Sequence, residues 1–320
     1  MHILVIGGAG YIGSHVVKEL LQHGVQVTVF DDMSTGQPEN LFPEAGFIKG
    51  NILDISALEN AMQGVDGVVH LAAKKAVGES MEKPELYAVN NITGTLNILN
   101  AMAKFGVKNF VFSSTAAVYG MPQYVPVDEK HPTEPINFYG FSKLEIERFL
   151  PWYGKLKGIN WIALRYFNAV GYDADGDVKG LEKNPQNLLP IVMETAKGIR
   201  AGMKIFGKDY DTVDGTCVRD YIHVSDLASA HWLALKYLEE GGQSQTLNLG
   251  TGKGISVLEM VQMAEKIIGH AINYDFADRR AGDPGLLLAS SDVANAVLGW
   301  KPIHSDLENM IRTTWAMYQK

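Results

Sequence analysis

Short runs of apolar residues recur along the first half of the chain, and longer stretches with helical spacing separate them. The runs, rich in Val, Ile and Phe, cover residues 2–6, 25–30, 47–49, 67–71, 108–113 and 159–165. Continuous apolar runs of this length are typical of strands that are buried on both faces. Apolar residues with helical spacing fill the intervening stretches 11–22, 56–63, 84–104 and 138–156. The pattern predicts strands that alternate with helices.

The second half of the chain has a less regular pattern. Residues 171–187 and 209–215 are rich in Gly, Asp and Asn. They predict loops, and the first is long enough to be functional. Residues 246–249 predict a strand. Helices are predicted at 188–198, 224–239, 257–268 and 306–318. Ser225 or Asp226 is able to cap the start of the second of these helices.

Strand–helix alternation predicts a parallel sheet with right-handed crossovers and helices on both faces. With 320 residues, the chain exceeds the size of most single-core domains, so one large domain or two coupled ones are expected. We predict an α/β fold with a doubly wound parallel sheet in residues 1–170. A smaller, mixed α/β domain that binds the substrate is predicted in residues 171–320, and segments near 220–250 are expected to rejoin the main sheet.

Composition and charge exclude several classes of function. The formal net charge is -8 and the sequence pI is about 5.6, whereas nucleic-acid-binding proteins usually carry a basic excess. No apolar run in the sequence reaches the length needed to cross a bilayer, so neither nucleic acid nor membrane is expected as a partner. The single cysteine, Cys217, cannot form an intramolecular disulfide. The first strand leaves no room for a signal peptide, and we expect a cytoplasmic protein.

A glycine-rich stretch follows the first predicted strand and opens the first helix. Gly7, Gly10 and Gly13 are spaced three apart. Glycines permit a tight turn, a close approach of the backbone to a pyrophosphate, and close packing of helix on strand. The start of the helix also offers unpaired N–H groups to the phosphate. Such a string alone often arises by chance in flexible turns, but the strand–turn–helix context favours a dinucleotide site.

Two acidic residues, Asp31 and Asp32, follow the second predicted strand, where a ribose-binding acid is expected. A carboxylate there accepts hydrogen bonds from ribose hydroxyls and repels a 2′-phosphate. No Arg or Lys stands beside Asp31 in the sequence. We therefore predict a Rossmann-type fold that binds NAD in preference to NADP.

Tyr139 and Lys143 lie four residues apart in a predicted helix, so they share one helix face. A free tyrosine has a pKa of about 10. We expect a nearby ammonium and the positive nicotinamide ring to lower that pKa and favour the phenolate. Thr115 closes the fifth strand, at the edge where ligands bind open α/β sheets. Most pairs with this spacing are a surface aromatic and a solvated charge, but together these residues predict catalytic Tyr139, Lys143 and Thr115.

With these motifs, the chain resembles the extended short-chain dehydrogenase/reductase family over nearly its whole length. Its later motifs are similar to those of the UDP-glucose 4-epimerase branch. The resemblance implies that UDP-glucose and UDP-galactose are interconverted through a 4-keto intermediate, with transient reduction of bound NAD. The matching stretches are 7–16, 70–80 (HLAAKKAVGES), 90–95, 111–120, 139–143, 165–171 (RYFNAVG), 206–212, 219–223 (RDYIH) and 279–283 (RRAGD).

The resemblance also implies which residues hold a tightly bound NAD. Lys143 would bind the nicotinamide ribose and Asp31 the adenosine ribose, while Asn51 stands where the family usually has Asp. A solvated loop lysine is the alternative for Lys75, and core packing is the alternative for Phe167. The implied cofactor-binding residues are Gly7, Gly10, Tyr11, Ile12, Gly13, Asp31, Asn51, Ile52, Leu71, Ala72, Ala73, Lys75, Asn90, Tyr139, Lys143 and Phe167.

For the UDP-sugar, the resemblance implies that Arg219 and Arg280 neutralise the diphosphate and that Asp283 binds its ribose. A surface salt bridge is the alternative for both arginines. Leu287 stands where the family gates its sugar pocket, so acceptance of N-acetylated sugars or UDP-pentoses stays open. The implied substrate-binding residues are Thr115, Tyr139, Asn168, Asn187, Leu188, Lys204, Ile205, Phe206, Arg219, Arg280, Asp283 and Leu287.

Three other functions are alternatives to this interpretation. A 4-epimerase of another nucleotide sugar would share every motif. A nucleotide-sugar 4,6-dehydratase would place an acid just after Thr115, where Ala116 and Ala117 stand. A non-catalytic NAD-sensing protein would keep the glycine loop but lose the Tyr–Lys pair. The resemblance suggests a homodimer. We interpret His70 and His223 as polar or core residues, and the sequence predicts no metal site.

Overall fold

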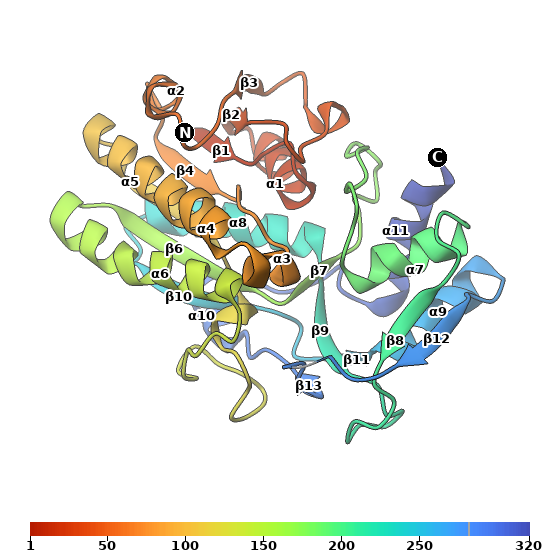
Figure 1. Cartoon of the computed structure of the whole chain (residues 1–320). Coiled ribbons are helices and arrows are strands. Elements are labelled where there is room, and N and C mark those ends of the chain that lie inside the picture. Colours follow the sequence, from red (N-terminus) through yellow and green to blue (C-terminus); the bar gives the residue numbers. More distant parts are fainter. Residues whose placement is uncertain (281) are drawn as a thin grey trace.

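The computed structural model describes residues 1–280 and 282–320. A seven-stranded sheet forms its centre (Figure 1), and every strand pairing in that sheet is parallel. The carboxyl ends of all its strands therefore meet at one edge. The predicted α/β fold is confirmed, and residues 246–249 belong to the main sheet as expected. In spatial order the strands are β10 (Gln245–Leu249), β6 (Asn160–Tyr166), β5 (Asn109–Thr115), β4 (Gly67–His70), β1 (His2–Ile6), β2 (Gln26–Asp31) and β3 (Gly46–Lys49).

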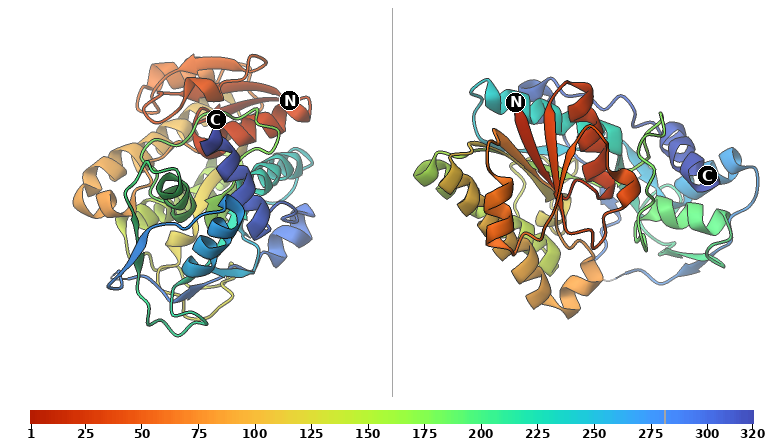
Figure 2. Two further views of the ribbon diagram at one scale, coloured as in Figure 1. Left: turned by 90° about the vertical axis from the view of Figure 1, so that its right-hand side faces the viewer. Right: turned by 90° about the horizontal axis from the view of Figure 1, so that it is seen from above.

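Helices cover both faces of this sheet (Figure 2). In β1, Ile3 and Val5 pack into one apolar layer, whereas Leu4 and Ile6 pack into the other, and all four are fully buried. Each such side chain contributes about 1.5–3 kcal/mol relative to exposure. The first layer is completed by α1 (Tyr11–Gln22), α8 (Val224–Glu239) and α10 (Asp292–Leu298), and the second by α2 (Ile55–Ala61), α5 (Gly94–Phe105) and α6 (Phe138–Lys157). Within the described ranges, no helix is long and apolar enough to span a membrane.

The single helix predicted over residues 84–104 is divided in the structure. After α3 (Val77–Glu82), which the sequence pattern did not predict, α4 (Pro84–Tyr87) runs into a π-helical segment, Ala88–Thr93, and then into α5. The side chain of Asn91 in this segment bonds to both backbone groups of Lys74. Single π-helical turns often occur at functional sites, and this one fastens the helix to the loop after β4.

The remaining elements form a second body of structure beside the carboxyl edge of the sheet. Its core is built from α7, α9, α11 and the short strands they cover. The helices predicted at 188–198, 257–268 and 306–318 are confirmed to within two residues. The short strands β7, β8 and β9 were not predicted, because they lack long apolar runs. These elements are β7 (Asn168–Val170), α7 (Leu188–Ala196), β8 (Met203–Phe206), β9 (Val218–His223), β11 (Gly254–Ser256), α9 (Val257–Ile268), β12 (Tyr274–Ala277), β13 (Leu286–Leu287) and α11 (Leu307–Gln319).

The chain crosses between the two bodies more than once. Strand β9 pairs with β7, β11 and β13 in a small sheet. The next elements along the chain, α8 and β10, belong to the main sheet and its helical layer. The division into domains at residue 170 stays a prediction.

Helix α8 begins differently from the prediction. Ser225 or Asp226 was expected as its cap, but the N-cap is His223, whose Nδ1 accepts a hydrogen bond from the Ser225 N–H at 3.1 Å. Asp226 is fully buried, and its carboxylate accepts hydrogen bonds from the distant segment 303–305. The predicted cap was wrong, because residues 303–305, far along the chain, donate hydrogen bonds to the Asp226 carboxylate.

Candidate active site

The glycine loop between β1 and α1 turns so tightly that two of its glycines leave no room for a side chain. Gly7 has a φ of 87°, and a Cβ there would lie 2.6 Å from the backbone nitrogen of Ala72. A Cβ on Gly13 would lie 2.0 Å from the carbonyl oxygen of Gly7. Around a Cβ on Gly10, that same oxygen, at 3.3 Å, is the only described atom within 4 Å. The outer glycines close the turn, and the middle one faces open space where a ligand could approach.

Asp31 ends β2 beside this loop and is 9% exposed. Its carboxylate accepts hydrogen bonds from the N–H groups of Ala9, at 3.0 Å, and Met33, at 2.9 Å. Burial raises the pKa of Asp31, and these two bonds oppose that rise. A carboxylate has about four acceptor positions, so Asp31 can brace the glycine loop and still accept bonds from a ribose.

Residues 51 and 52 follow β3 and residues 71–73 follow β4, so both segments lie at the carboxyl edge of the sheet. The Asn51 amide donates to the Asp32 carboxylate at 3.0 Å, a bond that the family's usual Asp could make only if protonated. Ile52 is 5% exposed and packs closely on Gly94, where a Cβ would lie 2.4 Å from the Ile52 Cδ1. Residues 71–73 follow β4 and are partly exposed.

Lys143 is buried against β5. Its ammonium donates to the carbonyl oxygen of Ser113 at 2.7 Å and lies 4.8 Å from the centre of the Phe112 ring. Its exposed fraction is 3%. Burial lowers the pKa of Lys143 to about 7, although the nearby charge of Glu147 acts in the opposite direction. Near neutral pH this lysine therefore exchanges readily between its charged and neutral forms.

Tyr139 lies one turn before Lys143 on α6, and its phenol interacts with the Thr115 hydroxyl at the end of β5. Gly140 allows this approach, because a Cβ there would lie 2.4 Å from the carbonyl oxygen of Ala117. Burial raises the pKa of Tyr139, and the hydrogen bond with Thr115 opposes that rise. The expected lowering by a nearby ammonium is wrong for the protein alone, where burial raises the pKa and the hydrogen bond with Thr115 is what opposes the rise. The structure does bring Tyr139, Lys143 and Thr115 together.

Arg219 and Asp283, predicted on the substrate side, pair with each other at 3.2 Å. Arg219 lies on β9 with a side chain that is 13% exposed, and Leu287 on β13 stands opposite it in register. Leu287 is partly buried against the apolar cluster that contains Phe167. The salt bridge considered as an alternative for Arg219 exists, but it lies at the junction of the two bodies and is only partly exposed.

The other predicted substrate residues lie on β7, α7 and β8. The Arg280 guanidinium stacks 3.8 Å from the centre of the Phe206 ring, and Lys204 is exposed on the same strand as Phe206. Ile205 is fully buried in the core of the second body. Its side chain is therefore turned away from a ligand, and its predicted place along the substrate rests on its main chain.

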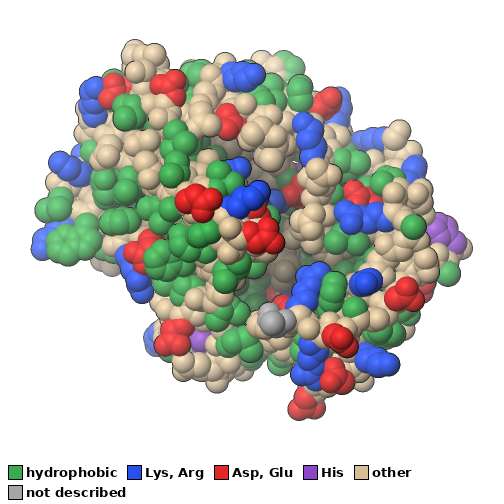
Figure 3. All heavy atoms as spheres, in the orientation of Figure 1, with side chains coloured by type: hydrophobic (Ala, Val, Ile, Leu, Met, Phe, Trp, Pro, Cys, Tyr) green, Lys and Arg blue, Asp and Glu red, His purple; other side chains and the backbone are tan. Residues whose placement is uncertain are grey.

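Three further residues predicted on the substrate side lie at element ends. Asn168 begins β7 and donates to the Asp220 carbonyl at 2.9 Å. Asn187 is the N-cap of α7 and Leu188 is its first residue. Figure 3 shows the surface hollowed between the two bodies, with charged side chains at the rim.

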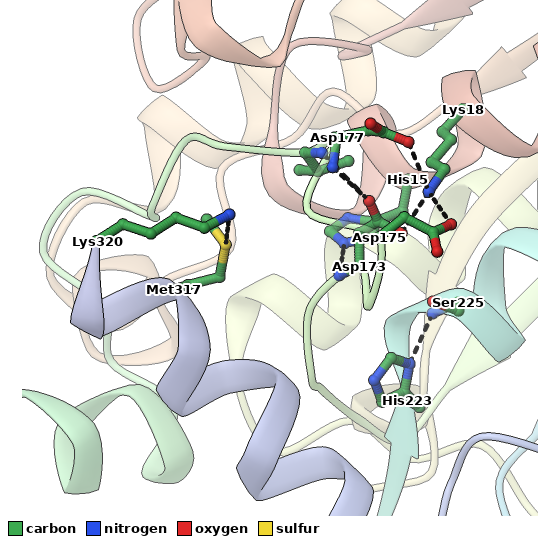
Figure 4. Close-up of polar contacts among 10 residues, drawn as sticks. His15, Lys18, Asp173, Asp175, Asp177, His223, Ser225, Met317 and Lys320 are labelled. Carbon is green, nitrogen blue, oxygen red and sulfur yellow. Dashed lines mark hydrogen bonds and ion pairs between the residues drawn. The ribbon is translucent and has the colours of Figure 1, made fainter.

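Residues 171–187 form a loop, as predicted, and the loop lies against α1 (Figure 4). The Tyr11 hydroxyl donates to the carbonyl oxygen of Gly171 at 2.5 Å. The N–H of Asp173 donates to His15 Nε2 at 3.0 Å. Tyr11, predicted beside the cofactor diphosphate, therefore also fixes the start of this loop.

Three carboxylates of this loop converge on the ammonium of Lys18. Asp173, Asp175 and Asp177 lie 2.5, 2.7 and 3.1 Å from Lys18 Nζ (Figure 4). Burial alone would lower the pKa of Lys18, but the three carboxylates raise it well above its ordinary value. The aspartates have the spacing of a cation site. The sequence does not reveal this group, because Lys18 lies 155 residues from Asp173.

Lys75 forms an ion pair with Glu182, which belongs to the same loop, although its own side chain is 58% exposed. Asn90 lies partly exposed in the π-helical segment. Phe167 is 8% exposed and packs with Leu144 and other apolar residues. The position of Lys75 agrees with the alternative of a solvated lysine, and that of Phe167 agrees with core packing. Neither position excludes contact with a ligand.

Several polar residues that support the site were not found from the sequence. The Ser80 hydroxyl accepts a hydrogen bond from the Tyr139 N–H at 3.1 Å. Glu147 pairs with Arg165 and with the Ser114 hydroxyl inside the protein. The spacing of Glu147, four residues after Lys143, is a signal that could have revealed it.

Residues 3–250 match the model of the NAD dependent epimerase/dehydratase family. A UDP-glucose 4-epimerase of Lacticaseibacillus casei is 46% identical over 100% of this chain and 97% of that protein. One of Streptococcus mutans is also 46% identical, over 99% and 97% of the two chains.

Solved structures agree with these relatives in fold. The UDP-glucose 4-epimerase from Brucella ovis in complex with NAD superposes with a TM-score of 0.97 at 41% identity, covering 99% of this chain and 98% of that one. The UDP-glucose 4-epimerase from Bifidobacterium longum in complex with NAD+ and UDP superposes with a TM-score of 0.92 at 37% identity, covering 100% and 98%. The similarity covers nearly the whole length of each chain.

Proposed function

Because the chain belongs to the NAD dependent epimerase/dehydratase family, we propose that it is an NAD-dependent isomerase that interconverts UDP-glucose and UDP-galactose. One observation carries the proposal above the others. The Tyr139 phenol meets the Thr115 hydroxyl, with the buried Lys143 one turn farther along α6, in a chain that is 46% identical over its whole length to a UDP-glucose 4-epimerase. This arrangement supports proton transfer to and from a hydroxyl oxygen whose carbon exchanges a hydride.

The residues of the sheet edge fit NAD. The loop leaves open space at Gly10, and Asp31 keeps acceptor positions free beside it. Residues 71–73, which follow β4, and Lys143, which bonds to Ser113 on β5, extend this site from the glycine loop toward Tyr139. When bound, NAD supplies a positively charged hydride acceptor, which allows an alcohol carbon to invert through a ketone.

Tyr139 acts as the base that takes the proton of the sugar 4-hydroxyl and later returns it. Thr115 donates a hydrogen bond to the same sugar oxygen and holds it near the phenol. Lys143 contributes positive charge behind the phenol and binds ribose hydroxyls. Because burial raises the pKa of Tyr139 in the protein alone, formation of the phenolate depends on positive charge brought beside it.

On the opposite side, Arg219 and Arg280 bind the diphosphate of the UDP-sugar. The planar fork of arginine suits phosphate oxygens, and Asp283 can release Arg219 and bind a ribose hydroxyl instead. Inversion at C4 requires the sugar to present both faces while its nucleotide stays bound. Strong charged contacts to UDP with weak contacts to the sugar, against apolar groups such as Leu287, meet that requirement.

A second candidate is a 4-epimerase that accepts UDP-N-acetylhexosamines as well. By the resemblance, Leu287 stands at the position that gates the sugar pocket, and it is neither the bulky residue of strict members nor a small one, so it leaves this second candidate open. A structural neighbour named as the UDP-Glc/GlcNAc 4-epimerase of Campylobacter jejuni is 36% identical with a TM-score of 0.88. A 4,6-dehydratase is disfavoured, because Ala116 and Ala117 follow Thr115 where that chemistry needs an acid.

We also propose that the chain forms a homodimer in the cytoplasm. Trp152 and Leu156, four residues apart on α6, are 60% and 65% exposed, and Val89 is 49% exposed. Figure 3 shows apolar side chains gathered on the side of the molecule that α5 and α6 form. Contiguous apolar surface of this kind usually meets a partner. The lone, buried Cys217 fits a reducing compartment.

The test is incubation of purified protein, without added NAD, with UDP-glucose, UDP-N-acetylglucosamine and UDP-xylose in turn. We expect UDP-galactose from UDP-glucose, with NAD released on denaturing the protein. Conversion of the N-acetylated sugar at a similar rate would favour the second candidate. Protein that binds NAD but converts none of these sugars would overturn the proposal.

A further inference from the structure

A third polar residue follows Tyr139 and Lys143 on the same face of α6. Tyr139, Lys143 and Glu147 are spaced four apart, so they form one stripe along the helix. Glu147 is 7% exposed. A carboxylate is seldom buried so deeply unless it is paired, and the proton and substrate contacts proposed above do not use it.

The partners of Glu147 come from two neighbouring strands. Arg165 on β6 binds it in a forked geometry, with Nε 3.0 Å from one carboxylate oxygen and an NH2 nitrogen 2.5 Å from the other. The Ser114 hydroxyl on β5 donates to the carboxylate at 2.5 Å. Arg165 is itself 6% exposed and donates its remaining terminal nitrogen to Tyr119. Both charges are therefore paired and hydrogen-bonded inside the protein, which is the condition for a stable buried ion pair.

These contacts join α6, which carries Tyr139, to β5, which carries Thr115. Ser114 stands between Ser113, whose carbonyl binds Lys143, and Thr115. Arg165 lies opposite Ser114 in the parallel register of β5 and β6. One carboxylate thus fixes the end of β5 relative to α6, and with it the spacing between Thr115, Tyr139 and Lys143.

The same carboxylate acts on the charge of Lys143. The ionisable groups that interact with this lysine are Glu147 on α6 and His70 on β4, with Arg165 on the far side of Glu147. Among the groups that the structure describes, Glu147 is the one carboxylate that favours the ammonium, whereas burial opposes it. Removal of this negative charge would make Lys143 neutral at a lower pH.

We propose that Glu147, held by Arg165 and Ser114, is a positioning residue for the epimerase reaction, which fixes α6 against β5 and so sets Lys143 and Tyr139 relative to Thr115. The inference rests on the proposed function, because it assigns Glu147 a role in that reaction. Glu147 acts through Lys143 and Thr115 and touches neither substrate nor cofactor.

The first experiment compares Glu147→Gln with Glu145→Gln. Glu145 lies on the same helix and pairs with Arg148 at the surface, so it is a matched control for loss of one carboxylate. For E147Q we expect kcat to fall by about tenfold or more with KM for UDP-glucose within about threefold. The alkaline limb of the kcat profile should move down by about one pH unit. E145Q should keep the wild-type profile.

Two more variants separate positioning from folding. Ser114→Ala leaves the ion pair intact and removes one hydrogen bond, so we expect stable protein with a several-fold lower kcat. E147Q/R165Q removes both buried charges, which should restore stability lost in E147Q without restoring the alkaline limb. If neither variant changes kcat or its pH profile while stability alone changes, Glu147 is structural and the proposal is wrong.

A final measurement does not depend on catalysis. In protein labelled with 13C at lysine Cε, NMR titration gives the pKa of Lys143 directly, with Lys143→Arg identifying its signal. We expect a lower pKa in E147Q than in wild type or E145Q. An unchanged Lys143 titration in E147Q would overturn the inference, whereas a wild-type protein inactive on UDP-glucose would overturn the proposed function instead.

Discussion

The two sides of the candidate site differ in how deeply their charged side chains are buried. On the sheet side, Lys143, Glu147 and Arg165 are 3%, 7% and 6% exposed, and each is bonded to other protein groups. On the nucleotide side, Lys204 and Arg280 are exposed, and Arg219, which is 13% exposed, is paired with Asp283. The charges of the sheet side are desolvated, whereas Lys204 and Arg280 are hydrated.

This difference separates proton chemistry from ligand binding. Desolvation changes proton affinity strongly, so the buried side can adjust Tyr139 and Lys143 to a reaction near neutral pH. Hydrated cations keep their ordinary charge and attract a diphosphate over several ångströms. The loop of residues 171–187 connects the two sides, since it binds α1 through Lys18 and leads into α7.

The largest effect should come from removing the phenol. For Tyr139→Phe we expect kcat to fall by at least about a thousandfold, or roughly 4 kcal/mol, because the proposed mechanism has no second base for the 4-hydroxyl. Stability and NAD content should stay close to wild type, since the ring remains. Initial rates of UDP-galactose formation measure this, and a kcat within tenfold of wild type would remove Tyr139 as the base.

The next largest effect is the pH dependence of stability that desolvation of Lys143 on the sheet side should cause. Burial lowers the pKa of Lys143 from 10.5 to about 7. Between these values the unfolded chain holds a proton that the folded chain lacks, so the contribution of Lys143 to stability rises with pH across this window. Relative to Lys143→Met, the wild type should gain about 3 kcal/mol between pH 7 and 9.5. Unfolding free energies in urea measure the difference, and equal slopes for both proteins would show that Lys143 is hydrated.

On the nucleotide side, Arg280→Ala should weaken binding and leave chemistry intact. We expect KM for UDP-glucose to rise by about 10- to 100-fold, or roughly 1.4–2.8 kcal/mol, with kcat within about threefold. Arg279→Ala is the matched control, because Arg279 pairs with Asp209 at the surface. If R280A lowers kcat as much as it raises KM, the separation between the two sides is wrong.

The smallest effect concerns the ion pair that bridges the two sides. Lys75 pairs with Glu182, but its side chain is 58% exposed. For Glu182→Gln we expect a loss of stability below about 1 kcal/mol, because exposed ion pairs contribute little. Lys18→Met, which removes the buried cation of α1 that pairs with three carboxylates of the same loop, should cost clearly more. Thermal midpoints of the two variants make the comparison, and an equal loss would contradict it.

The main sheet could be predicted because each of its strands is marked by an apolar run within a few consecutive residues. Runs such as residues 2–6 are apolar at every position, and strands covered on both faces need this pattern. The helix predicted over 84–104 was interrupted because Asn91 bonds to Lys74, a contact between separate elements. His223 replaced the predicted cap of α8 because segment 303–305 takes up Asp226. These failures have one cause, since a distant partner changed a local preference.

By itself, the sequence determined the glycine spacing that closes a tight turn and the four-residue spacing that sets Tyr139 and Lys143 on one helix face. Both follow from backbone geometry within a few residues. Only the tertiary structure decided the direction of the Tyr139 pKa shift, the aspartates around Lys18 and the pairing of Glu147 with Arg165. These depend on burial and on contacts across the chain, and spacing along the chain does not encode how much water a group loses on folding.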